Sequence, residues 1–348
     1  MLIKIIKKII RKYRTFCDRI LPKYFIKSKL LSSIYYLFFS SQFKREHHAV
    51  LVGKVKHTKE SLKNKDSFYT LIRNIHRLEK GLLMRPRRDI FALDFIVETM
   101  NNYVTIFKEE DYLPNSQVKW VYDVLNEYFS VTGDHPVINK QRKIFEQTSF
   151  KVSITNKHSL PYKRLEVDKP AISYEDFYKL TKYRRSVRWF LNKKVPHYLI
   201  DKAILAANQS PSACNRQPFE YRVVDNPELL EKITSLPMGV GGYRENIPMM
   251  IVAVGNLDAY FDERDRHLIY IDTSLANMSL IFALETLGLS SCCINWPDIE
   301  ELEKKMEIAL KLEKHQRAIM CLAVGYPDPE GMVAFSEKRN LDLIRKFN

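Results

Sequence analysis

The 348-residue sequence contains few cysteines, and their spacing excludes several kinds of site. There are five, an odd number, and no two form a CxxC pair, so the sequence predicts neither a zinc site nor a thioredoxin-like redox site. The adjacent Cys292 and Cys293 are expected to lie in a buried strand as small apolar residues. Free cysteines are typical of a reducing compartment, and a cytoplasmic protein is therefore expected.

Long hydrophobic runs and dinucleotide-binding glycines are missing as well. The apolar run 30–39 (LLSSIYYLFF) is too short to cross a bilayer, which takes about 20 residues, so no transmembrane segment is expected. The first residues carry scattered charges and no small-residue cleavage site, which argues against a signal peptide. The glycine-rich segment 238–243 (MGVGGY) lacks the GxGxxG spacing, the preceding strand and the ribose-binding acid of a Rossmann site.

Acidic residues are scarce near the N-terminus, where the positive charge gathers. The net charge is +15, and the segment before Phe91 accounts for all of the excess. Residues 2–13 (LIKIIKKIIRKY) predict a helix with one apolar face and one basic face. This pattern fits an anchor on a membrane surface, with peripheral contact through residues 1–40, and equally a helix packed on the protein with a solvated lysine face. Both interpretations stay open.

The length predicts two domains. Near residue 173 the sequence pattern changes from mainly helical to alternating helices and strands. Residues 1–150 are expected to form a basic, mainly helical region. A helix is expected over 68–83, where Asp66-Ser67 can cap its start, and helical spacing continues at 94–107 and 115–129. Residues 130–172 contain Gly133, Pro136, Pro161 and Pro170 and are expected to be irregular, with 151–172 as the linker. Residues 173–348 would form the second domain.

This second region alternates helices and strands, which predicts an α+β fold. The expected helices are 174–182, 197–208, 227–235, 272–287 and 299–310, and the expected strands are 220–224, 249–254, 291–295 and 318–324.

Three clusters of residues could carry chemistry. In the first, Arg184, Ser186 and Arg188 alternate on an extended segment and so share one side. Two guanidinium groups with a hydroxyl between them suit an anionic ligand. The alternative interpretation is a basic turn exposed to solvent. The third cluster is the basic pair Lys338-Arg339.

The second cluster, residues 210–218 (SPSACNRQP), has no bulky side chain over four positions and then two amides. Such a loop lets a planar ring approach the backbone, while Asn215 and Gln217 can recognise polar ring edges. A plain helix-to-strand connection is the alternative interpretation.

Taken in order, these motifs resemble the nitroreductase family. The family's first motif reads R-R-S-[IV]-R-x-F and its second S-P-S-x-x-N-x-Q-P-[WF]; this sequence has RRSVRWF and, about 25 residues later, SPSACNRQPF. The apolar segment DTSLANMSLIFALETLGL, the segment SSCCIN and the basic pair follow. The resemblance covers roughly residues 173–348, half of the chain.

The resemblance implies an α+β fold with a mixed sheet flanked by helices, and an obligate homodimer with non-covalent FMN at its interface. Arg184 would hold the FMN phosphate together with Lys338 or Arg339, while Ser186 and Arg188 would contact the pyrimidine edge. The second motif would line the flavin from the other subunit, and the backbone near Cys293 and Ile294 would lie near flavin N5. The implied cofactor-binding residues are Arg184, Arg185, Ser186, Arg188, Pro211, Ser212, Ala213, Asn215, Gln217, Cys293, Ile294, Lys338 and Arg339. No metal site is expected.

The implied activity is that of an FMN-dependent oxidoreductase, which passes two electrons from NAD(P)H through FMN to a small organic acceptor in a ping-pong cycle. A cation near the flavin pyrimidine tunes the reduction potential, and Arg188 is the candidate for this role. Without a Rossmann site, NAD(P)H is expected to bind transiently over the flavin. Trp189, Phe219, Tyr243 and Trp296 either narrow the pocket or pack in the core.

Two other functions stay open. The segment NIHRLEKGL followed by MRPRR is similar to bacterial nitroreductase-like proteins with a helical extension, some with surface-polysaccharide functions. This favours, as the alternative, a flavin-binding or membrane-associated accessory protein in surface-polysaccharide biosynthesis. Nucleic-acid binding rests on charge alone, since no RNP, helix-turn-helix or zinc-finger signature is present.

Overall fold

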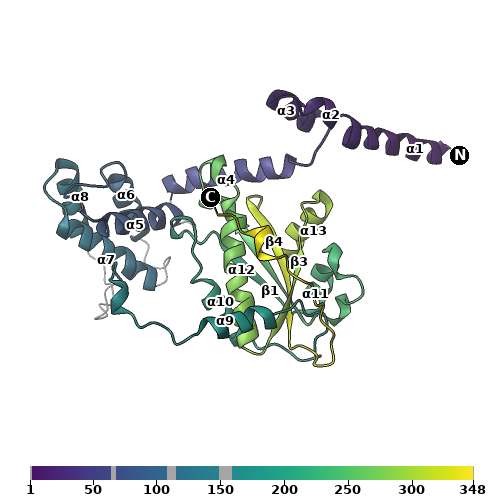
Figure 1. The fold of residues 1–348 in the computed structure, drawn as a ribbon. Helices are drawn as coiled ribbons and strands as arrows, with labels where there is room; N and C mark the ends of the chain where they lie inside the picture. Colours follow the sequence, from purple (N-terminus) through teal and green to yellow (C-terminus); the bar gives the residue numbers. More distant parts are fainter. Residues whose placement is uncertain (1, 64–67, 108–114, 149–158, 348) are drawn as a thin grey trace.

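The computed structural model describes residues 2–63, 68–107, 115–148 and 159–347. The chain begins with a slender helical segment: α1 (Leu2–Thr15), a π-helical turn (Phe16–Ile20), α2 (Pro22–Phe25) and α3 (Lys29–Phe38). Figure 1 shows these elements extending past one end of α4 (Lys44–Lys63), away from the sheet. The helix expected at residues 2–13 is confirmed.

Four further helices form a helical cluster, and three of these were expected. They are α5 (Tyr69–Leu82), α6 (Ile96–Phe107), α7 (Asn115–Val131) and α8 (Pro136–Gln147). Leu71, Ile75 and Leu78 recur at helical spacing on α5 and are fully buried against the other helices. The cluster therefore has an apolar core of its own.

The expectation of irregular structure over 130–172 is wrong for residues 136–147, which form α8. Pro136 stands at the first helical position, where its missing N–H costs nothing. The ring of His135 caps the same end, because its Nδ1 accepts from the Val137 amide at 3.3 Å. Ile138 and Phe145 of α8 are buried in the core of the helical cluster. Residues 151–158 of the expected linker, 151–172, lie outside the described residues.

A four-stranded sheet organises the remainder of the chain, in the order β1-β2-β4-β3. Its strands are β1 (Phe219–Val224), β2 (Met249–Asn256), β3 (Ser290–Asn295) and β4 (Gln316–Gly325), and all three pairings are antiparallel. The parallel component of the expected mixed sheet is reduced to one bridge, between Ser186 and Ser291, in the described part of the chain.

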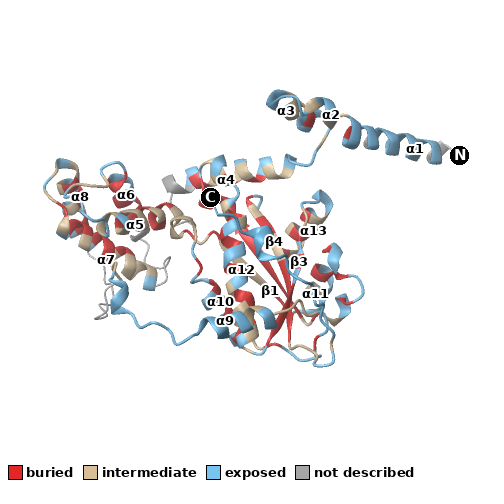
Figure 2. Cartoon of the chain, in the orientation of Figure 1, coloured by how far each residue is buried: buried red, intermediate tan, exposed pale blue. Residues whose placement is uncertain are grey.

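Helices cover both faces of this sheet, so the α+β fold is confirmed. α10 (His197–Ala207) and α12 (Leu268–Thr286) pack on one face, and α11 (Pro227–Thr234) and α13 (Glu300–Leu310) on the other (Figure 1). Every residue of β2 is buried, which explains its unbroken apolar run MMIVAV. Figure 2 shows these buried strands at the centre, whereas α1 is exposed along its length.

Two smaller helices flank this layered region: α9 (Tyr174–Tyr183), before the first motif, and α14 (Leu341–Ile344), near the C-terminus. Residues 263–286 are long and apolar enough to cross a membrane by length and composition, the one such stretch in the described chain. Core helices share this property, and Ala276, Leu280 and Leu284 of α12 are fully buried against α10 and the sheet.

Helix α4 joins the helical cluster to the layered region. The backbone of Gly53 lies so close to Leu257 that a Cβ atom on it would come within 2.8 Å of that residue. His57 Nδ1 lies 2.7 Å from the carbonyl oxygen of Asp258, and Arg45 forms ion pairs with Glu300 and Glu307 of α13. This close packing places α5 against residues 213–215 of the second motif.

Candidate functional site

The first motif begins where α9 ends, at Arg184. Ser186 forms the parallel bridge to Ser291 of β3, and the Val187 amide donates to the Ser291 carbonyl at 3.1 Å. Because the segment is extended, alternate side chains point to opposite sides. Val187 packs on the core of the sheet, which leaves Arg184, Ser186 and Arg188 on the other side.

The C-terminal segment closes over this row of side chains. Together they line a cavity of about 160 Å³, whose lining residues are Arg184, Arg185, Ser186, Arg188, Ala334, Phe335, Ser336 and Lys338. Arg339 does not line it and instead donates to the Leu343 carbonyl at 3.0 Å. Of the two basic residues proposed for the third cluster, the structure therefore brings Lys338 to the first motif.

This cavity has the donors that a phosphate needs. Arg184, Arg185, Arg188 and Lys338 form no ion pair with a carboxylate among the described residues. The Arg184 Nε is buried and has no hydrogen-bond partner. A buried, unpartnered guanidinium N–H is costly unless a ligand accepts from it. The residues present thus fit the anionic end of FMN.

The second motif has an unusual backbone. Cys214, Asn215 and Gln217 all have positive φ angles, of 54°, 55° and 51°. Left-handed conformations are uncommon for residues other than glycine and cost about 1 kcal/mol or more each. Such strain is typical of functional loops that their surroundings hold in place.

Several hydrogen bonds hold this strained loop. The Ala213 amide donates to Asp272 Oδ2 at 3.0 Å, and the Tyr260 hydroxyl donates to the same oxygen at 3.0 Å. Within the loop, the Gln217 amide donates to Ser212 Oγ at 3.0 Å. Burial raises the pKa of Asp272, whereas its two donors oppose that rise. Asp272 and Tyr260 were not identified from the sequence; the available signal was an acidic residue in the first half of the long apolar helix α12.

Within one chain the first and second motifs lie at opposite ends of the sheet. The first motif is bridged to Ser291, which pairs with Val324 near the end of β4. The second motif leads into Phe219, whose partner Gly255 pairs with Arg317 at the start of β4. Seven residues of strand separate these positions on β4, about 23 Å at roughly 3.3 Å per residue. One flavin ring cannot touch both motifs of the same chain.

The expectation that both Cys292 and Cys293 are buried is wrong for one of them. Cys292 is buried, but Cys293 is exposed, since successive strand residues face opposite sides. The protein around the Cys293 side chain still partly desolvates the thiol and so raises its pKa; the neighbouring Cys292 adds to the shift and Arg184 opposes it. The Ile294 side chain is buried in the core, so only its backbone is available to a ligand.

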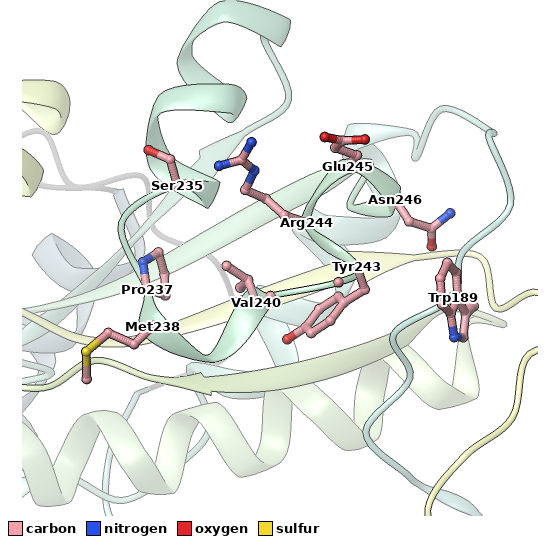
Figure 3. Close-up of a pocket in the computed structure, with 11 residues that line it drawn as sticks. Trp189, Ser235, Pro237, Met238, Val240, Tyr243, Arg244, Glu245 and Asn246 are labelled. Atoms are coloured by element: carbon pink, nitrogen blue, oxygen red, sulfur yellow. The ribbon is translucent and has the colours of Figure 1, made fainter.

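A larger cavity, of about 710 Å³, lies beside the first motif (Figure 3). Its lining includes Trp189 and the loop 237–246, and Figure 3 shows Trp189 on a separate segment from Tyr243, Arg244 and Glu245. The other two aromatic candidates do not line it. Trp296 is buried and donates to Glu303 at 2.5 Å, and Phe219 packs against the core of the α10–α12 face.

Tyr243 connects this cavity to the smaller one. The Arg188 guanidinium carbon lies 5.9 Å from the centre of the Tyr243 ring, and the Tyr243 hydroxyl donates to the Gly239 carbonyl at 3.1 Å. Burial raises the pKa of Tyr243 to about 12, so the phenol is protonated at neutral pH. Asn246 holds the segment that carries Trp189, because its side chain accepts from the Phe190 amide at 2.5 Å and donates to the Phe190 carbonyl at 3.1 Å.

Comparison with known proteins identifies the family to which this fold and these motifs belong. The sequence model of the nitroreductase family matches residues 181–239 and 245–326. A protein of Methanothermobacter thermautotrophicus, provisionally named NADH dehydrogenase/NAD(P)H nitroreductase, is 30% identical over 159 residues, which cover 45% of this chain and 80% of that protein. Human iodotyrosine deiodinase 1 is 25% identical over 198 residues, which cover 49% of this chain and 68% of that protein.

One solved structure is also similar to this chain. The FMN-dependent nitroreductase of Clostridium difficile R20291 is 25% identical, covers 44% of this chain and 90% of its own, and aligns with a TM-score of 0.39. The chain belongs to the nitroreductase family and is an oxidoreductase. Members of this family usually bind FMN and are typically homodimers.

Proposed function

We propose that this chain is an FMN-dependent oxidoreductase that moves two electrons from NAD(P)H, through FMN, to a small organic acceptor in a ping-pong cycle. The observation that carries the proposal is the small cavity of the first motif. Four cations surround it that form no ion pair with any described residue, and one of them has a buried N–H that is unpartnered within the described part of the chain. An anion with several oxygens satisfies such a site.

In the proposal, two pairs of residues from this cavity contact two different parts of FMN. Arg184 and Lys338 hold the FMN phosphate through charge-assisted hydrogen bonds. Ser186 and Arg188 face the pyrimidine edge, where a cation stabilises negative charge and tunes the reduction potential. FMN itself supplies the hydride chemistry when bound. No side chain is needed as a general acid in this scheme.

We further propose that the functional unit is a homodimer with a flavin at each of two shared sites. The separation of about 23 Å along β4 between the two motifs supports this arrangement. In a two-fold dimer, the first motif of one subunit can meet the second motif of its partner. The strained loop 212–217 would then line the flavin across the interface, held in shape by Asp272.

The acceptor is proposed to enter the cavity of about 710 Å³, which is large enough for a small organic molecule. Trp189 and Tyr243 offer apolar surface there, and Arg244 and Glu245 offer charges of both signs. The names of the relatives indicate different acceptors, iodotyrosine in one and a nitro compound in another. NAD(P)H as the donor rests on the relative's name. Since the chain has no Rossmann motif, NAD(P)H would bind transiently over the flavin.

Mixing two inactive variants tests the proposed shared site. Arg184→Ala removes the phosphate contact and Asn215→Ala the contact from the second motif, so each homodimer carries one defect in both sites. When the two proteins are unfolded together and refolded, half of the dimers are mixed, and one site in each mixed dimer is intact. FMN-dependent NAD(P)H oxidation should return at about a quarter of the wild-type level. No recovery would place both motifs in the same site of one chain and would refute the shared arrangement.

A further inference from the structure

The N-terminal arm, residues 2–39, contacts the rest of the described chain near its C-terminal end, where the ring of Tyr36 packs against Phe43. Every hydrogen bond of the arm that the described residues show is made within residues 2–40. Figure 1 shows α1, α2 and α3 projecting beyond α4, with α1 farthest from the sheet. The arm therefore presents both faces of α1 to its surroundings.

Helix α1 separates apolar and basic side chains completely. Ile5, Ile6, Ile9, Ile10 and Tyr13 are exposed, between 46% and 61% of their full surface. At 100° per residue they fall within an arc of about 140°. The exposed basic side chains fill the opposite arc of about 140° and comprise Lys4, Lys7, Lys8, Arg11 and Lys12. Helix α1 contains no acidic residue that could neutralise them.

The rest of the arm has a small core and still exposes large apolar side chains. Tyr35 is buried, and its hydroxyl donates to the Cys17 carbonyl at 3.0 Å. The rings of Phe25 and Phe39 pack around Tyr35. On the outside of α3, Leu30, Leu37 and Phe38 are each more than 60% exposed. Apolar side chains gathered in this way mark a surface that another phase or molecule covers.

We propose that the N-terminal arm is a peripheral anchor that places α1 in the interface of an anionic lipid bilayer. The isoleucine face would enter the boundary between headgroups and acyl chains, and the lysines and Arg11 would reach the lipid phosphates. The anchor would hold this oxidoreductase at the inner face of the membrane, where anionic lipids are concentrated. This inference does not depend on the proposed function.

The positive charge of the arm, together with its apolar face, favours an anionic bilayer over a second copy of the arm or a nucleic acid. Residues 2–39 contain ten Lys and Arg and a single acid, Asp18. A second copy of the arm would be repelled by the same charge. A nucleic acid would use the basic arc and leave the isoleucine arc exposed to water. An anionic bilayer is the partner that satisfies both arcs at once.

Cosedimentation of the full chain with lipid vesicles tests the proposal. Vesicles of phosphatidylcholine with phosphatidylserine should bind the protein, whereas vesicles of phosphatidylcholine alone should bind it at least tenfold less. The double variant Ile5→Ser/Ile9→Ser should lower the partition coefficient by about tenfold or more, because the apolar face is lost while the charge is kept. Since both side chains are exposed, the fold should be unaffected.

Ile308→Ser is the matched control, since Ile308 is 77% exposed on α13 and lies outside the arm. It should bind vesicles like the wild type. Equal binding of the wild type and the Ile5/Ile9 variant would mean adsorption by charge alone and would overturn the proposal. Failure of the wild type to bind anionic vesicles, with DNA retained instead, would overturn it as well and assign the arm to nucleic acid.

Discussion

Replacing Arg184 with alanine separates a ligand-binding role from a structural one. The guanidinium lines the phosphate-sized cavity, and its Nε is buried without a partner. If FMN accepts from this group, the variant loses a charge-assisted hydrogen bond worth about 1.5–3 kcal/mol. That corresponds to a dissociation constant for FMN raised by roughly tenfold to more than a hundredfold. The apoprotein should lose little, because the removed group is unsatisfied without a ligand.

Titrating apoprotein with FMN and following flavin fluorescence gives the affinity, and thermal unfolding of the apoprotein gives the stability. Arg184→Lys keeps the charge but not the fork of donors, so it should bind FMN with intermediate affinity. Arg264→Ala is the matched control, since Arg264 is exposed and pairs only with local acids. An unchanged FMN affinity in Arg184→Ala would refute the assignment, whether or not the variant apoprotein is less stable.

Three further outcomes follow from particular contacts. Arg188→Ala should lower the flavin reduction potential by about 30 mV, the equivalent of about 1.4 kcal/mol for two electrons, with a smaller loss of affinity than Arg184→Ala; an unshifted potential in a spectroelectrochemical titration removes Arg188 from this role. Gly325→Ala should destabilise the protein by about 1–3 kcal/mol in urea unfolding, because the new Cβ would lie 2.6 Å from Pro248 Cγ and 2.8 Å from a Phe190 ring carbon. Gly241→Ala, where nothing lies within 4 Å, should be neutral, and equal effects at the two positions would contradict the packing argument. Burial, with Lys56 adding to the shift, lowers the pKa of His315 to about 4 from its ordinary value of 6.5. The unfolded state therefore binds the proton first, and stability should fall by up to about 3 kcal/mol as the pH drops from 7 towards 4. His315→Gln should flatten this dependence, and an unchanged slope would mean that other groups cause it.

The order of helices and strands after residue 173 was predictable because each element carries a local signature. The unbroken apolar run of β2 and the long apolar helix before Gly288 are examples, and both appear within a few residues of their expected ends. Helix α8 was missed because Pro136 and Gly133 suggest a loop. A proline at the first helical position instead favours the start of a helix. Whether Pro136 begins a helix or lies in a loop depends on the core against which the segment packs.

The candidate site was predictable in its residues but not in its arrangement. Motif spacing singled out Arg184, Ser186 and Arg188, and the structure places them around one cavity. The sequence near residue 338 does not indicate that Lys338 lines this cavity while Arg339 donates to α14. The path of the C-terminal segment determines which of the two side chains reaches the cavity. The support of the second motif by Asp272 also depends on contacts far apart in sequence. Long-range packing sets these features, and single-sequence patterns do not encode it.

The absorbance spectrum of the purified protein, recorded with FMN and then with NADH or NADPH under anaerobic conditions, tests the central claim most directly. The account predicts the two flavin bands in the protein fraction after gel filtration, and their bleaching when a nicotinamide is added. A colourless protein that does not retain added FMN would contradict it. The motifs would then persist as a scaffold without the cofactor.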